Sequence, residues 1–62
     1  MINKNIKEYR IMHNLSQKQL GEKLGYSART ISDWENGNTE PNISAIKALV
    51  SFFGISYEDL LD

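Results

Sequence analysis

The stretch that decides the fold is SQKQLGEKLGYSARTISDWENG, which runs from Ser16 to Gly37. Its capping residues and the spacing of its apolar residues predict two short helices, at 17–24 and 28–36. Between them, Gly25 supplies the left-handed backbone conformation that ends a helix. Two short helices joined by a tight turn that contains glycine are the signature of a DNA-binding helix-turn-helix.

The apolar spacing of the second helix decides which of its faces is left outside. Ile31 and Trp34 lie three residues apart and are expected to face the core. The base-contact candidates on the outer face are Ala28, Arg29, Ser32 and Asp33. Among them, Arg29 suits guanine, Ala28 suits a thymine methyl group, and Asp33 suits a cytosine amino group or repels the wrong sequence. For residues 28–36 alone, a solvated surface helix is the alternative interpretation. The capped partner helix at 17–24 favours the interpretation of 28–36 as a DNA-recognition helix.

Three further helices are expected around this pair, at 2–13, 43–53 and 57–61. Apolar residues at helical spacing predict the first two of these three, and the pattern Ser-x-x-Asp that begins at Ser56 predicts the last. The expected architecture is therefore all-α, a compact five-helix bundle that forms one domain over residues 1–62.

The composition argues against several classes of protein. The chain has 62 residues, no cysteine and one histidine, so we expect no disulfide, no metal site and no cofactor. That histidine, His13, is expected to be a surface residue at a helix end. With no partner for it and no glycine-rich phosphate loop, we expect no enzyme. No apolar run approaches the roughly 20 residues of a membrane span, and no signal peptide is evident, so a cytoplasmic location is expected.

The charge of the chain is unevenly distributed. The net charge is −1, whereas DNA-binding domains are usually basic. Residues 1–31 nevertheless carry six Lys and Arg against two Glu, a charge of +4, while residues 32–62 carry one Lys against six acidic residues, a charge of −5. We therefore expect weak general attraction to DNA, with an affinity that depends on specific contacts and on dimerisation.

Nearly the whole chain resembles the lambdoid phage repressor and Cro family of helix-turn-helix proteins, the xenobiotic-response-element class of regulators. Gly25 matches the turn glycine of the family, Ile31 its buried aliphatic residue, and the segment 34–37 its aromatic-Glu-x-Gly ending. Gly21 departs from the usual alanine. The resemblance implies a lambda-repressor-like domain that binds double-stranded DNA sequence-specifically and acts as a transcriptional regulator, in most cases a repressor.

The resemblance also implies a structural role for two charged residues. Arg10 lies on a largely apolar face of the first expected helix, and Glu35 lies near the end of the third. In the family, the matching positions form a partly buried ion pair. Such a pair would hold the first helix against the end of the recognition helix, because an unpaired charge at either position would cost several kcal/mol.

Contacts with the DNA backbone are expected at the second helix and after the third. Gln17 opens the second helix, where its amide and the free backbone N–H groups can meet a phosphate. The phosphate-contact candidates are Gln17, Lys18, Asn36, Asn38 and Thr39.

One recognition helix reads few base pairs, so we expect a homodimer on a pseudo-palindromic operator. Phe52, Ile55 and Tyr57 are the candidate dimer contacts, and no small-molecule ligand is expected. The alternative is a protein-binding regulatory module of the same fold, similar to an antitoxin or an antirepressor. DNA is favoured because the outer face of residues 28–36 lacks the aliphatic or aromatic anchor that a protein-binding helix presents.

Overall fold

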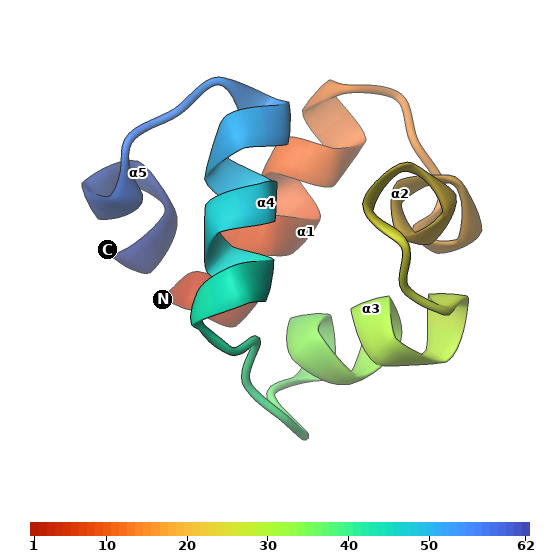
Figure 1. Cartoon of the computed structure of the whole chain (residues 1–62). Coiled ribbons are helices and arrows are strands. Elements are labelled where there is room, and N and C mark those ends of the chain that lie inside the picture. The colour runs from red at the N-terminus through yellow and green to blue at the C-terminus, as the bar shows by residue number, and fades with distance from the viewer.

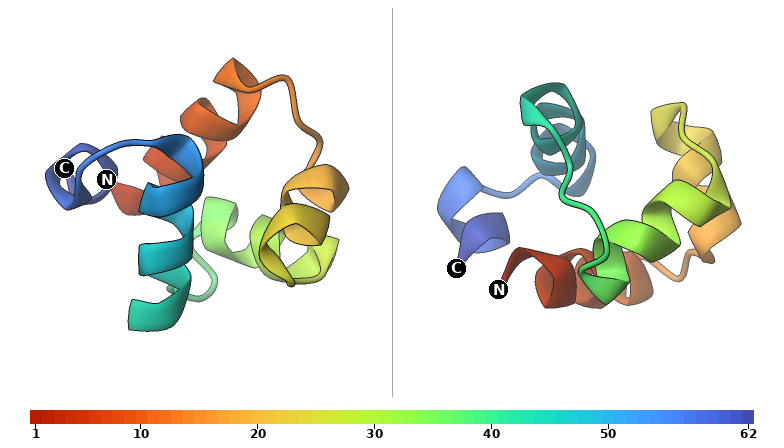
Figure 2. Two further views of the ribbon diagram at one scale, coloured as in Figure 1. Left: turned by 45° about the horizontal axis from the view of Figure 1, so that its top comes forward. Right: turned by 90° about the horizontal axis from the view of Figure 1, so that it is seen from below.

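The computed structural model describes residues 1–62 and contains five α-helices and no strands. The helices are α1 (Ile2–Met12), α2 (Gln17–Leu24), α3 (Ala28–Asn36), α4 (Ile43–Phe53) and α5 (Tyr57–Leu61). α1 and α4 lie in the middle of the molecule, with α2 and α3 on one side and α5 on the other (Figures 1 and 2). The all-α, five-helix architecture predicted from the sequence is confirmed.

Every helix after the first begins at a side-chain cap. At the start of α2, the Ser16 hydroxyl accepts a bond of 3.0 Å from the Gln19 backbone N–H, and the Ser16 N–H donates to the Gln19 amide oxygen at 2.8 Å. The other capping residues are Ser27, Asn42 and Ser56. These caps satisfy backbone donors that have no partner inside the helix, and they fix where four of the helices begin.

The predicted end of α1 at His13 is wrong by one residue. His13 has left the helical region, and Asn14 takes a left-handed φ of 57°. The Leu15 N–H then donates to the Arg10 carbonyl at 3.2 Å, and the Asn14 N–H donates to the Ile11 carbonyl at 2.9 Å. These two bonds form the motif that closes a helix on a left-handed residue, so α1 ends at Met12.

The core draws on every helix. One residue of each helix is completely buried: Ile6, Leu20, Ile31, Leu49 and Leu60. Four more apolar residues complete the core: Trp34, Ala45, Val50 and Phe53. Nine buried side chains are few, so each helix depends on its neighbours for most of its stability. None of the five helices has the length and the apolar composition needed to cross a membrane.

Gly21 lies where α2 is packed most tightly against the turn that leads into α3. The N–H groups of Gly25 and Tyr26 both donate to the Gly21 carbonyl at 2.8 Å, so the turn folds back on this residue. A β-carbon at position 21 would collide with the backbone carbonyl oxygen of Tyr26. An alanine here, usual in the family that the sequence resembles, therefore requires the backbone of the turn to move.

The substitution Gly21→Ala is expected to lower the free energy of unfolding by about 1–2 kcal/mol, as measured by urea denaturation. The helix propensity of alanine favours the variant by about 1 kcal/mol, but the backbone rearrangement outweighs this gain. Ser51→Ala, at an exposed position in α4, is the control and should change stability by less than about 0.5 kcal/mol. A Gly21→Ala variant more stable than the parent would contradict the expected collision.

Candidate nucleic-acid interface

α3 lies at the edge of the molecule and packs only one of its faces against the protein. It contacts α1 and α2 (Figure 2). Its residues Ile31 and Trp34 are buried in the core, as the sequence predicted. Trp34 also packs edge-on against Tyr26 of the turn, with ring centres 4.9 Å apart. The residues left exposed or partly exposed are Ala28, Arg29, Thr30, Ser32, Asp33 and Asn36. All four base-contact candidates therefore lie on one accessible surface.

The polar side chains of this surface are linked in two pairs, each spanning one turn of α3. Arg29 Nε donates to Asp33 Oδ1 at 3.3 Å, and Asn36 Nδ2 donates to Ser32 Oγ at 3.3 Å. The Arg29 side chain is 86% exposed, whereas that of Asp33 is 24% exposed. The surface thus presents an exposed guanidinium paired with a more confined carboxylate, together with one hydroxyl and one amide.

A largely buried ion pair holds α3 against α1. Arg10 Nε donates to Glu35 Oε2 at 2.7 Å, and Arg10 Nη2 donates to Glu35 Oε1 at 3.0 Å. The third guanidinium nitrogen, Nη1, donates to the Leu15 carbonyl at 2.7 Å. The hydrogen bonds that Arg10 donates to Glu35 raise the pKa of Arg10. Burial of Arg10 opposes this rise, and the negative charge of Glu35 adds to it. The pair implied by the resemblance is present, with the Glu35 side chain only 2% exposed.

Gln17 has a partner that the sequence reasoning missed. Its amide nitrogen donates to Glu35 Oε1 at 3.1 Å, so this side chain joins α2 to the ion pair of α1 and α3. A carboxylate offers about four acceptor positions, more than one guanidinium fills, and that surplus was the available signal. The Gln17 backbone N–H belongs to the first turn of α2, whose N–H groups lack partners within the helix.

The remaining phosphate candidates lie at the start of α2 and around the end of α3. They are Lys18, Asn36, Asn38 and Thr39, and all four are exposed. The backbone N–H groups of Asn38 and Thr39 donate to the Asp33 carbonyl at 2.9 and 3.4 Å, which ties this connection to α3. Their side chains are exposed next to the outer face of α3, which we call the recognition face.

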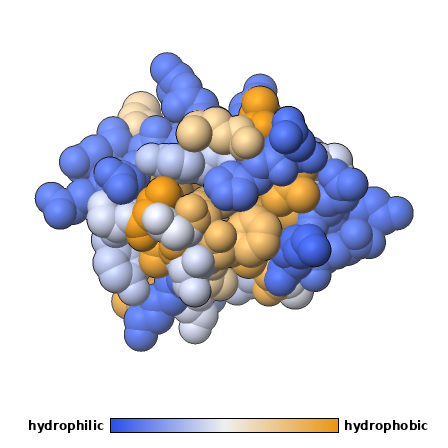
Figure 3. All heavy atoms as spheres, turned by 90° about the horizontal axis from the view of Figure 1, so that it is seen from above, coloured by the Kyte–Doolittle hydropathy of each residue, from blue (hydrophilic) through white to orange (hydrophobic).

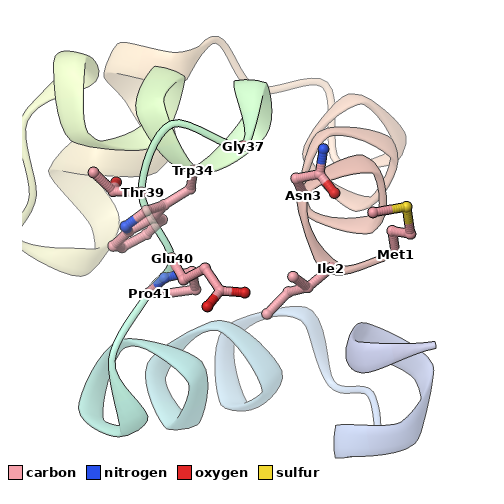
Figure 4. A pocket seen from close by; sticks show the side chains of 8 residues that line it. All are labelled: Met1, Ile2, Asn3, Trp34, Gly37, Thr39, Glu40 and Pro41. Carbon is pink, nitrogen blue, oxygen red and sulfur yellow. The ribbon is translucent and has the colours of Figure 1, made fainter.

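An open groove lies between the start of α1 and the connection from α3 to α4. Figure 4 shows Thr39, Glu40 and Pro41 of this connection and Trp34 of α3 across from the first residues of α1. The only charged side chain that lines the groove is the carboxylate of Glu40. An acidic lining repels phosphate, so the groove does not extend the candidate surface.

The charges of the molecule are separated in space as well as in sequence. α1 and α2 carry four exposed lysines, Lys4, Lys7, Lys18 and Lys23. The exposed acidic residues of the C-terminal end are Glu58, Asp59 and Asp62. α5 lies on the far side of α1 and α4 from α2 and α3, so the negative end is directed away from the recognition face (Figure 1).

The dimer candidates lie on a different face, which contains the ends of α1 and α4 and the connection to α5. Figure 3 shows apolar side chains gathered in the middle of this face, with polar ones around them. Phe52 is half-buried and lies 5.5 Å from Phe53 and 6.0 Å from His13 between ring centres. Ile55 is also half-buried, and Tyr57 is 47% exposed. Phe52 therefore covers the core and remains partly accessible.

Comparisons with known proteins agree with this geometry. The helix-turn-helix family model matches residues 6–60. A transcriptional regulator of the helix-turn-helix type from Methanocaldococcus jannaschii is 42% identical over 89% of this chain and 83% of its own length. The transcriptional activator BcrR of Enterococcus faecalis is 37% identical over 95% of this chain, which spans only 29% of that activator.

A solved structure of the same fold contains DNA. The crystal structure of the P22 c2 repressor in complex with a synthetic operator superposes with a TM-score of 0.92 and 32% sequence identity. It covers 100% of this chain and 94% of the repressor chain. The chain belongs to the helix-turn-helix family, of the type found in phage repressors.

Proposed function

We propose that this protein is a transcriptional regulator that binds double-stranded DNA sequence-specifically, with α3 in the major groove. The observation that carries the proposal is the exposed face of α3, which is short, polar and held in a fixed position by the buried Arg10–Glu35 pair. Helices of this class place the residues of their first turns against base edges. The P22 repressor structure, which holds operator DNA on the same fold, supports this docking.

The base contacts fall to the four residues of the outer face. Arg29 is the second residue of α3, and its exposed guanidinium suits the O6 and N7 acceptors of guanine. Ala28 suits a thymine methyl group, and Ser32 suits several base edges through its hydroxyl. Asp33 accepts hydrogen bonds only, so it suits the amino group of cytosine.

The phosphate contacts flank this face. Lys18 and the first N–H groups of α2 lie on one side, and Asn36, Asn38 and Thr39 lie on the other. Such contacts fix the register of a protein on DNA without reading its sequence. Gln17 acts here chiefly through its bond to Glu35, which sets the position of α2 relative to α3. We propose a cytoplasmic location for the protein, with the DNA that it controls.

Repression is the mode of regulation that we propose. A protein that occupies an operator blocks a promoter by its volume alone, whereas an activator needs a further surface for its partner. The alternative of a module that binds only protein is less well supported. The outer face of α3 exposes no aromatic side chain and no aliphatic one larger than the Ala28 methyl group, so it offers no anchor of the usual kind.

We propose that the regulator acts as a homodimer on a pseudo-palindromic operator. The proposed contacts are Phe52 near the end of α4, Ile55 in the connection to α5 and Tyr57 at the start of α5. Because this surface is small, its burial leaves little favourable free energy after the entropic cost of association. The dimer should therefore be weak in the absence of DNA.

Selection of bound sites from a pool of random duplexes tests the function and the assembly together. The expected outcome is an enriched pseudo-palindrome whose half-site centres lie one helical turn apart, roughly 34–36 Å. Footprinting on that site should show both halves protected. Enrichment of no sequence would refute the proposed function, and protection of a single half-site at saturation would refute the dimer alone.

A further inference from the structure

The outer face of α3 carries a carboxylate where the proposed function brings a polyanion. Asp33 lies among the four residues proposed to meet the bases, and every phosphate near it raises the cost of its charge. An acidic residue in this position needs a compensating role. The geometry of the one hydrogen-bond partner of its carboxylate indicates what that role is.

Asp33 holds the side chain of Arg29. Arg29 Nε donates to Asp33 Oδ1 at 3.3 Å, and this is the bond that restrains an otherwise free guanidinium. Asp33 is the more confined of the two, since its side chain is 24% exposed against 86% for Arg29. Exposed ion pairs one turn apart contribute little to folding, so stability does not explain the pair.

The bond uses Arg29 Nε. Recognition of guanine by the end of the guanidinium needs only the other two nitrogens. With Nε occupied by Asp33, Nη1 and Nη2 remain as two parallel donors at the tip of the side chain. Such a fork matches the O6 and N7 acceptors of guanine. Asp33 Oδ2 forms no hydrogen bond of its own, and it is available to accept from an amino group in the same groove.

We propose that Asp33 is a positioning residue for Arg29, and that the two side chains act as one unit that reads a guanine and a neighbouring amino-bearing base. This inference rests on the proposed function and specifies how its recognition face works. The unit gains selectivity in two ways. A fixed fork loses less conformational entropy when it meets guanine, and the carboxylate repels base edges that present only acceptors.

The test compares Asp33→Asn with Glu40→Gln, which removes one negative charge from the neighbouring connection without touching Arg29. The probes are the duplex enriched by selection and its variants with each single base pair exchanged. Asp33→Asn should lower the preference for guanine at the Arg29 base pair by between about twofold and about tenfold, the effect of freeing one long side chain. At the neighbouring pair its preference should shift toward adenine, which an amide reads through N6 and N7.

Three controls make the result specific to the pair. Glu40→Gln should leave both base preferences unchanged. In an Arg29→Ala background, Asp33→Asn should no longer alter the preference at the guanine position. The midpoint of thermal unfolding should be the same for both acidic variants as for the parent, which excludes loss of fold as the cause.

Two results would overturn the inference while leaving the proposed function intact. One is an unchanged preference for guanine in Asp33→Asn. The other is a rise in affinity for the selected duplex with the preference for guanine retained. That result would mean that Asp33 only hinders the contact of Arg29 with DNA. A parent chain that shows no sequence preference at all would instead refute the proposed function.

Discussion

Glu35→Ala is expected to lower the free energy of unfolding by about 3–5 kcal/mol, because it leaves the Arg10 guanidinium buried without its carboxylate. Two of the three hydrogen bonds of Arg10 are lost with it, and the Gln17 amide also loses its acceptor. A domain of this size has a total stability of roughly 3–5 kcal/mol. Circular dichroism at 25 °C should therefore show the variant largely unfolded, and urea denaturation of Glu35→Gln, which keeps the shape, should show an intermediate loss.

The exposed ion pair of the same molecule provides the control. Asp33→Ala breaks the Arg29–Asp33 contact, in which the Arg29 side chain is 86% exposed, and should cost no more than about 1 kcal/mol. A double-mutant cycle of Arg10→Met and Glu35→Gln should then show strong coupling, since each partner is costly only when the other is left behind. Additive effects in that cycle would mean that the interaction between Arg10 and Glu35 contributes nothing to the free energy of unfolding.

The helices were predictable because the signals that form them are local. The bond between Ser16 and Gln19 spans three residues, and the same holds for Ser56 and Asp59. Each cap marks a helix start within a short window of sequence, independently of what the helix packs against. The one error of boundary, at His13, arose because the left-handed Asn14 closes α1 one residue earlier than the periodicity suggested.

Contacts between distant parts of the chain were accessible only where a family resemblance supplied them. The Arg10–Glu35 pair was expected for that reason, whereas the bond from Gln17 to the same carboxylate was not. The Asn5 amide, which donates to the Leu60 carbonyl at 2.8 Å and joins α1 to α5, carries no sequence signal at all. Such bonds depend on how the helices pack, and short-range patterns do not encode that packing.

On the outer face of α3, too, local features were predictable from the sequence, whereas a contact between two side chains was not. The phase of α3 follows from Ile31 and Trp34, so the residues on its outer face were predictable. From the sequence, Arg29 and Asp33 were predicted as two separate base contacts, although they are four residues apart on a helix. That spacing places side chains one above the other, and the structure joins them.

Arg29→Ala is expected to weaken binding to the selected duplex by about 1–3 kcal/mol and to relax the preference at one base pair. Lys18→Ala is the matched control, because Lys18 and Arg29 each occupy the second position of a helix and each contribute one exposed positive charge. Both variants should lose affinity for a scrambled duplex to a similar, small extent. Both should also lower the salt dependence of binding by about one counterion.

The difference between the two variants separates reading from positioning. The phosphate backbone is the same in every sequence, so Lys18→Ala should weaken the selected and the scrambled duplex by similar factors and keep their ratio. Arg29→Ala should reduce that ratio, since the guanidinium meets a base edge that only the selected duplex presents. Titrations of both duplexes at several salt concentrations measure each quantity. If Arg29→Ala lowers both affinities equally, Arg29 is a phosphate contact, and the sequence must be read by Ala28, Ser32 and Asp33.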